Sequence, residues 1–173
     1  MDIVEHYQAH WGAPLARLRC SDGRSWALPG PFRVAMFQPA PAEKIFATCG
    51  MGRELELHWV TRAALERDED LVVILHAVAE YHFNVARLGL GHTVNFGMPW
   101  QPGSRATHGL ISLPYLFGPE LEQSGDTSCL WLIPIAPEEL AFKKKHGLEE
   151  LEERFEAAQF DYSDPHRLPV VEE

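Results

Sequence analysis

Three consecutive segments in the first third of the chain have the hydrophobic pattern of β-strands. Residues 32–38 and 54–60 alternate between two sets of side chains, and residues 45–49 form a short apolar run between them. Within residues 54–60, Glu54, Glu56 and His58 alternate with apolar residues, so we expect one solvated face on this sheet. The connections are too short for a crossover helix, and the three strands should therefore pair antiparallel.

Two other segments have the three-to-four-residue period of amphipathic helices. Residues 3–11 predict a short helix that Asp2 can cap. Residues 69–88 predict a long helix, which must cover the apolar face of the sheet. His82 falls on the apolar stripe of the long helix, so we interpret it as a core histidine.

The part of the chain after residue 128 has the clearest structural signature. Residues 129–135 are apolar on both sides, as expected for a central strand that is covered on both faces. Pro137 suits the first turn of a following helix, and Gly147 suits its end. Acidic residues at the start of this helix and lysines at its end complement the helix dipole. A second helix follows over residues 148–158.

Together these patterns predict a single α+β domain, residues 1–173, with a mixed, largely antiparallel sheet flanked by helices. Its core should extend over residues 1–160, with an irregular tail in residues 161–173. Further short strands are predicted at residues 92–96 and 110–113, and Asp22–Gly23 is a turn signal between two short strands.

Two long loops, residues 97–109 and 114–128, carry the candidates for partner binding. Their aromatic residues either plug the ends of the core or form an exposed anchor, and the pattern leaves both interpretations open. The acidic residues would rim such an anchor and suit a basic partner. The candidates are Trp100, Tyr115, Phe117, Glu120, Glu122 and Asp126.

The charge balance restricts the class of partner. The chain has 25 acidic and 15 basic residues, which give a formal net charge of −10, and its pI is near 5.3. This field repels nucleic-acid phosphates and anionic membrane surfaces, so both are disfavoured as partners. It is compatible with a protein partner that has a basic surface.

The cysteines and the N-terminus indicate a cytoplasmic protein. Cys20, Cys49 and Cys129 are widely spaced, and their odd number suits neither a disulfide framework nor a zinc knuckle. The first residues lack the basic start and apolar core of a signal peptide. No run approaches the ~20 apolar residues that a membrane span needs.

No local motif specifies catalysis, and we expect neither a metal nor a cofactor. His6 and His10 stand one helical turn apart but have no third ligand nearby in the sequence. Gly-x-Ser-x-Gly and Ser-x-x-Lys motifs are absent. The alternative hypothesis is a small hydrolase or metal-dependent enzyme whose site assembles in three dimensions from His92, His108 and Cys129.

An ordered set of motifs resembles the suppressor-of-fused-like domain. The run Leu130-Trp131-Leu132-Ile133-Pro134-Ile135, followed by an acidic pair, Phe142 and Gly147, resembles the C-terminal signature of that family. Upstream, Thr48-Cys49-Gly50-Met51 and the strand Glu54-Leu55-Glu56-Leu57 agree in order and rough spacing. The resemblance extends over nearly the whole chain.

The resemblance implies a mixed α/β domain that recognises proteins and catalyses nothing. The animal suppressor of fused holds a transcription factor through an extended peptide added as a strand, and bacterial single-domain relatives look like immunity proteins. We therefore expect a non-catalytic immunity-type protein that neutralises a cognate, basic toxin domain. Regulation of another protein partner is left open. Binding would use the acidic loops or an exposed sheet edge.

Overall fold

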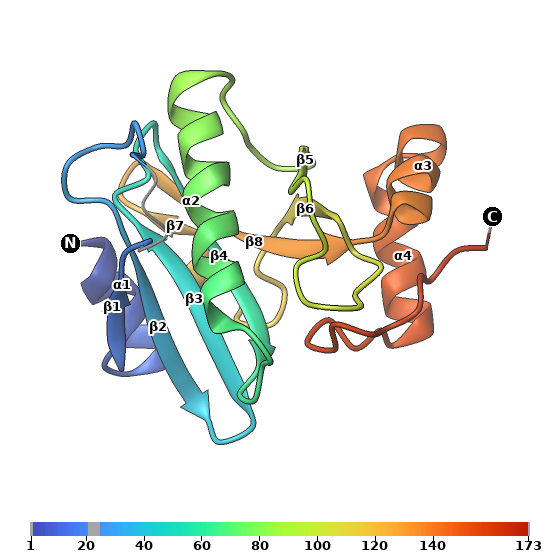
Figure 1. Cartoon of the computed structure of the whole chain (residues 1–173), viewed down its shortest axis with the longest axis horizontal. Helices are drawn as coiled ribbons and strands as arrows, with labels where there is room; N and C mark the ends of the chain where they lie inside the picture. The colour runs from blue at the N-terminus through green and yellow to red at the C-terminus, as the bar shows by residue number, and fades with distance from the viewer. Residues whose placement is uncertain (1, 21–24, 173) are drawn as a thin grey trace.

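The computed structural model describes residues 2–20 and 25–172, and these form one mixed sheet flanked by helices (Figure 1). The strands run in the order β1-β2-β3-β4-β8-β6-β5, and β7 pairs with β8 off this path. The predicted turn at Asp22–Gly23 lies outside the described residues. The strand bounds are β1 Ala16–Leu18, β2 Arg33–Ala40, β3 Glu43–Cys49, β4 Leu55–Arg62, β5 Thr93–Asn95, β6 His108–Ser112, β7 Gln123–Ser124 and β8 Thr127–Ile135.

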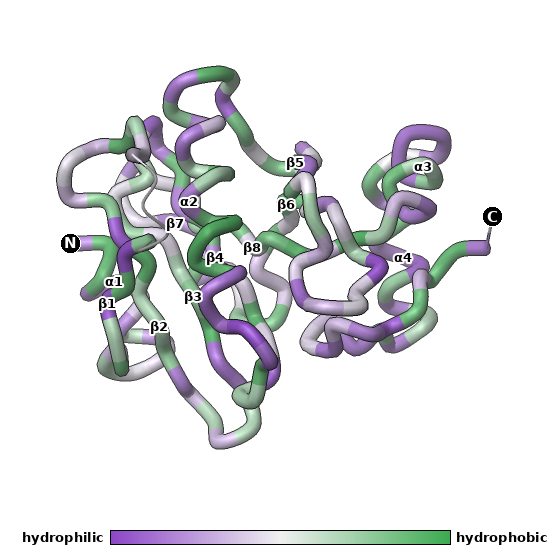
Figure 2. The backbone as a smooth tube through the Cα atoms, in the orientation of Figure 1, coloured by the Kyte–Doolittle hydropathy of each residue, from purple (hydrophilic) through white to green (hydrophobic). Residues whose placement is uncertain are grey.

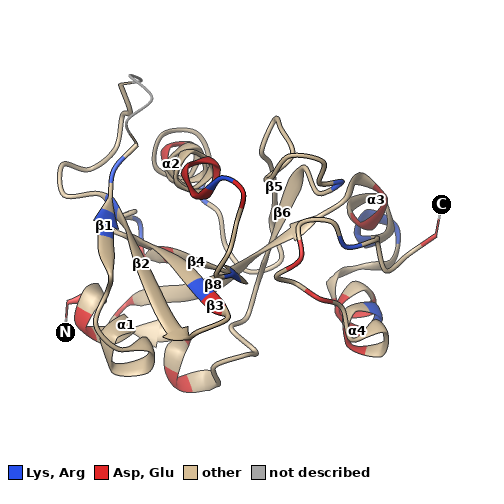
Figure 3. Ribbon diagram, turned by 60° about the horizontal axis from the view of Figure 1, so that its bottom comes forward, with Lys and Arg blue, Asp and Glu red and all other residues tan. Residues whose placement is uncertain are grey.

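Helices cover both faces of this sheet. Figure 3 shows α2 on one side and α1 on the other, and Figure 1 shows α3 and α4 together beyond the end of β8. The predicted α+β class, with a largely antiparallel sheet flanked by helices, is confirmed. Among the described helices, none has the length and hydrophobicity to cross a membrane. The helix bounds are α1 Ile3–Trp11, α2 Asp68–Asn84, α3 Pro137–His146 and α4 Leu148–Ala158, with a 3-10 helix η1 at Pro119–Leu121.

The first half of the sheet is the predicted antiparallel meander. β3 pairs antiparallel with both β2 and β4. β2 extends to Ala40, two residues beyond the predicted segment 32–38, and includes Pro39; its register with β3 is irregular between Phe37 and Ala40. Such irregularities accommodate a residue that cannot donate to the ladder.

The predicted solvated face of β4 is wrong, because the strand is buried on both sides. Glu56 is 4% exposed and His58 is fully buried. Trp11 of α1 and Phe117 pack against the His58 ring, with ring centroids 5.3 and 5.8 Å away. The polar alternation of β4 therefore marks buried polar groups rather than contact with water.

β8 is the central strand that the apolar run predicts. It lies between β4, to which it is parallel, and β6, to which it is antiparallel. Leu130 and Leu132 belong to the core beneath α2, whereas Trp131 and Ile133 belong to the core beneath α1 and α4. In Figure 2 the tube is strongly hydrophobic along β8, while α3 and α4 carry hydrophilic stretches.

His82 is a core histidine, as predicted, and it also determines where α2 ends. Its ring Nε2 lies 3.2 Å from the carbonyl oxygen of Gly52. Its Nδ1 accepts a 2.8 Å hydrogen bond from the backbone N–H of Leu88. This bond holds Leu88 in the loop after the helix, so α2 ends at Asn84, four residues before the predicted limit.

The C-terminal tail has no helix or strand within residues 161–172, yet it is docked on the domain through a buried ion pair. Arg167 donates two hydrogen bonds of 2.7 and 2.9 Å to the Glu139 carboxylate. That carboxylate also accepts bonds from the backbone N–H groups of Ala136 and Val170. Glu139 is fully buried, so the acidic start of α3 serves as an anchor for the tail as well as a helix cap.

Candidate functional site

The structure divides the predicted loop aromatics between core and surface. Trp100 is 1% exposed and packs 5.3 Å from Trp59, so the interpretation of Trp100 as an exposed anchor is wrong. Phe117 is partly buried against Trp11. Tyr115 alone of the three is largely exposed, at 61%. The predicted aromatic cluster therefore does not form.

The predicted acidic rim does not form around Tyr115 either. Glu120 lies in η1, where its charge acts on His10 of α1. Glu122 and Asp126 line a different hollow, together with Arg53 and Arg87. Glu122 and Asp126 therefore share one hollow, Glu120 lies apart from them in η1, and none of the three lines the groove that contains Tyr115.

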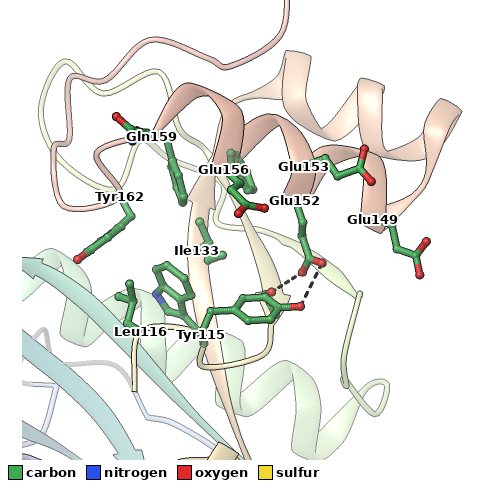
Figure 4. Close-up of a pocket in the computed structure, with 13 residues that line it drawn as sticks. Tyr115, Leu116, Ile133, Glu149, Glu152, Glu153, Glu156, Gln159 and Tyr162 are labelled. Carbon is green, nitrogen blue, oxygen red and sulfur yellow. Dashed lines mark hydrogen bonds between the residues drawn. The ribbon is translucent and has the colours of Figure 1, made fainter. Parts of the chain in front are cut away.

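Tyr115 instead lines a groove that no pattern in the sequence predicts, which we call the α4 groove (Figure 4). Its cavity volume is about 620 Å³. Trp131 and Ile133 of β8 contribute apolar surface, and so does Phe155 of α4. Leu116 follows Tyr115 along the loop side of the groove.

The helix side of the groove is acidic. Glu149, Glu152, Glu153 and Glu156 all line it, at the i, i+3, i+4, i+7 spacing that places side chains on one helix face. Figure 4 shows these side chains leaving α4 on the side of the groove. No Lys or Arg is among the described residues that line it. The Glu spacing is readable in the sequence, but without the fold a stripe of this kind looks like an ordinary solvated helix face.

Glu152 is held in place by two hydroxyl groups from the opposite side of the groove. Ser112 Oγ donates a 2.6 Å hydrogen bond to Glu152 Oε1, and the Tyr115 hydroxyl donates a 3.3 Å bond to Oε2. Partial burial, followed by the charge of Glu152, raises the pKa of Tyr115. Tyr115 therefore keeps its proton at neutral pH and remains a donor to the carboxylate.

The tail closes the end of the groove farthest from Glu149. Phe160 and Tyr162 line it, and Figure 4 shows Tyr162 and Gln159 at the end opposite Glu149. Arg167 stacks over Phe160, with its guanidinium carbon 5.2 Å from the ring centroid. The tail that supplies Tyr162 to the groove is the segment docked by the Glu139–Arg167 pair.

The three residues of the alternative enzyme hypothesis are not assembled. His108 pairs with Ile135 across the sheet, six residues along β8 from Cys129, which separates them by about 20 Å. Burial raises the pKa of the Cys129 thiol to about 12, so it is not a nucleophile at neutral pH. His92 is exposed near a different hollow.

Among residues 2–20 and 25–172, no group of three or more His, Cys, Asp or Glu side chains is placed to hold a metal ion. His6 of the predicted pair lies with its Nε2 3.1 Å from the carbonyl oxygen of Leu121, and the His6 and His10 rings are 5.2 Å apart. Their proximity is as predicted from the helix spacing.

Two buried side chains of β4, Glu56 and His58, have displaced pKa values. Glu56 accepts bonds of 2.6, 2.7 and 3.0 Å from Thr48 Oγ1, Gly50 N and Met51 N. Burial outweighs these bonds and raises the pKa of Glu56 to about 6. Burial also lowers the pKa of His58 to about 3, and within the described structure neither of its ring nitrogens has a hydrogen-bond partner. These groups affect stability, and both are closed to a ligand.

Comparisons with known proteins agree on one family. The family model described as "Suppressor of fused protein (SUFU)" matches residues 30–168. A crystal structure of a suppressor of fused homologue from Neisseria gonorrhoeae is 29% identical, with a TM-score of 0.86, and the match covers 99% of this chain and 96% of that one. Among curated proteins, none matches.

Two more distant structures share the fold alone. The Sufu–Fu complex structure matches with a TM-score of 0.68 at 13% identity, over 97% of this chain and 90% of that one. Drosophila Suppressor of Fused matches with the same TM-score and identity, over 98% of this chain and 50% of that one. This chain therefore corresponds to about half of the Drosophila protein.

Proposed function

Because the chain belongs to the suppressor of fused family, we propose that it is a non-catalytic protein-binding domain. In its finer form the proposal is an immunity-type role in the cytoplasm, in which the chain neutralises a cognate toxin by covering it. Regulation of another protein partner would use the same surface. A distant relative of the same fold has been solved in a complex named Sufu–Fu, which gives a precedent for partner binding by this fold.

The α4 groove is the observation that carries the proposal. It combines an apolar interior with four carboxylates, so it favours a partner that presents both apolar and cationic side chains. The net charge of −10 would also steer a basic partner towards the domain. The separated positions of His108 and Cys129 leave the enzyme hypothesis without a supporting arrangement.

The proposal is tested by capture from a native lysate with three forms of the full chain. Glu152→Lys combined with Glu153→Lys reverses charge inside the groove, and Glu150→Lys reverses it elsewhere on α4. Glu150 is a matched control because it lies on the same helix, outside the groove, beside His146. We expect one protein to be retained by the wild type and by the control and lost by the groove variant.

A second step separates the two roles. If the captured protein arrests growth when expressed alone and co-expression of this chain relieves the arrest, the role is immunity. A captured protein that causes no arrest would support regulation instead. Identical sets of captured proteins with the wild type and the groove variant would overturn the assignment of binding to this groove.

A further inference from the structure

We propose that the α4 groove binds a short linear peptide segment in which a Lys or Arg lies beside an apolar residue. This inference rests on the proposed protein-binding function and names the chemistry of its ligand. The shape of the groove is the first argument. A volume of about 620 Å³ lies in the range of sites that enclose a small ligand or a few side chains. A complete interface with a folded partner covers about 800 Å² on each side, so the groove by itself would receive one exposed segment of such a partner.

Charge complementarity is the second argument. In the described part of the chain, Glu149, Glu152, Glu153 and Glu156 form no ion pair with a Lys, Arg or His side chain. Like charges at i, i+3 and i, i+4 spacing destabilise a helix by about 0.2–0.5 kcal/mol for each pair. A cation in the groove would relieve this repulsion. The groove therefore selects a cationic occupant over a neutral or an acidic one.

Glu152 is the third argument, because its carboxylate is oriented before any ligand arrives. Ser112 Oγ and the Tyr115 hydroxyl each donate to one of its oxygens. Each carboxylate oxygen retains a further lone pair, so the group can still accept from an ammonium or guanidinium. A fixed carboxylate loses little side-chain entropy on binding, which makes Glu152 the residue that determines specificity for the cation.

The apolar neighbour in the ligand would contact the remaining surface of the groove. Tyr115 and Leu116 are 61% and 40% exposed, which is high for large side chains of this kind. Trp131 and Ile133 contribute further apolar surface to the same groove. Aromatic faces also attract cations, so the exposed ring of Tyr115 can contact the stem of the Lys or Arg that Glu152 binds.

The experiment is a selection of random heptapeptides on the immobilised full chain, followed by fluorescence anisotropy of labelled hits. We expect the selected sequences to carry Lys or Arg next to an aliphatic or aromatic residue. Glu152→Gln should weaken binding by about tenfold, because one partner of a partly desolvated charge pair is lost. Glu150→Gln, the matched control on α4, should change it by less than about twofold. Binding should also weaken as the salt concentration rises.

Enrichment of acidic or uncharged peptides, or equal affinities of the wild type and Glu152→Gln, would overturn the inference. A lysate partner that needs the groove, with no linear fragment of it binding, would also overturn it and leave the proposed function in place. Peptide binding without any groove-dependent lysate partner would have the opposite meaning. It would support the ligand chemistry and count against the proposed function.

Discussion

Replacing Arg167 with Met should show how strongly the C-terminal tail is fixed to the domain. The change keeps an unbranched apolar stem and removes the cation that neutralises Glu139. Glu139 is fully buried and Arg167 is 9% exposed, so water does not reach the carboxylate. Breaking a buried ion pair by removing one partner costs about 3–5 kcal/mol. We expect the free energy of unfolding of Arg167→Met to fall by this amount.

Urea unfolding followed by circular dichroism measures this loss. Arg154→Met is the matched control, because Arg154 is an exposed arginine over the Phe142 ring, with its guanidinium carbon 5.5 Å from the centroid. Its loss should cost only about 0.5–1 kcal/mol. Adding Glu139→Gln to Arg167→Met should recover part of the stability, because the uncompensated charge is then absent.

A loss of less than about 1 kcal/mol for Arg167→Met would refute the reasoning, because a loss that small is typical of a solvent-exposed ion pair. It would mean that Glu139 becomes hydrated when the tail leaves. The same variant should weaken peptide binding, since Tyr162 of the tail and the preceding Phe160 line the α4 groove. Unchanged peptide affinity would show that the groove does not need the tail.

Three further changes test the core. Glu56 has a pKa of about 6 in the fold against 4.5 for the free group, so it contributes stability below pH 4.5 that is lost as the pH rises through 6. Between about pH 3 and about pH 7.5 the wild type should lose about 2 kcal/mol relative to Glu56→Gln in urea titrations. His58 has the opposite effect: its pKa of about 3 lies below the ordinary 6.5, so the stability that it contributes is complete above pH 6.5 and falls as the solution is acidified. By pH 5 the wild type should lose about 2 kcal/mol relative to His58→Leu, and parallel pH profiles of the two proteins would contradict this. Gly109→Ala should lower stability by about 1–3 kcal/mol, because the new Cβ would stand 2.6 Å from Leu132 Cδ1 and 2.8 Å from Phe96 Cζ. Thermal melts measure this loss, and Gly89→Ala is the control: a Cβ there would meet no atom within 4 Å beyond its chain neighbours, so this change should be close to neutral.

The local elements were predictable because their signals are local. Helix α1 has the predicted bounds, and α3 begins at Pro137 and ends before Gly147, whose φ of +97° suits glycine. The end of α2 was not predictable, because it depends on a hydrogen bond between His82 and Leu88 that no propensity contains. The burial of Glu56 and His58 could not be predicted from the alternating pattern of β4 for a related reason. An alternating strand looks half-solvated until the elements that cover its polar face are known.

The candidate site was predicted only in part. Tyr115 lies in the groove, but Trp100 is in the core, and the acids Glu120, Glu122 and Asp126 lie on other surfaces. Loop residues that are close in sequence diverge in space when the chain turns between them. The acidic residues that do line the groove come from α4. Their spacing is visible in the sequence, but the sequence does not show that this helix face borders a groove.

The sequence by itself determined the fold class, the central strand β8, the capped helix after it and the family, because each rests on periodicity, on turn and cap chemistry, or on an ordered set of motifs. Only the tertiary structure decided that β4 is parallel to β8, that Arg167 reaches back to Glu139, and that α4 presents four glutamates to apolar surface of β8. These are contacts between residues far apart in the chain. Their formation depends on how whole elements pack, which the hydrophobic pattern of any single segment does not specify.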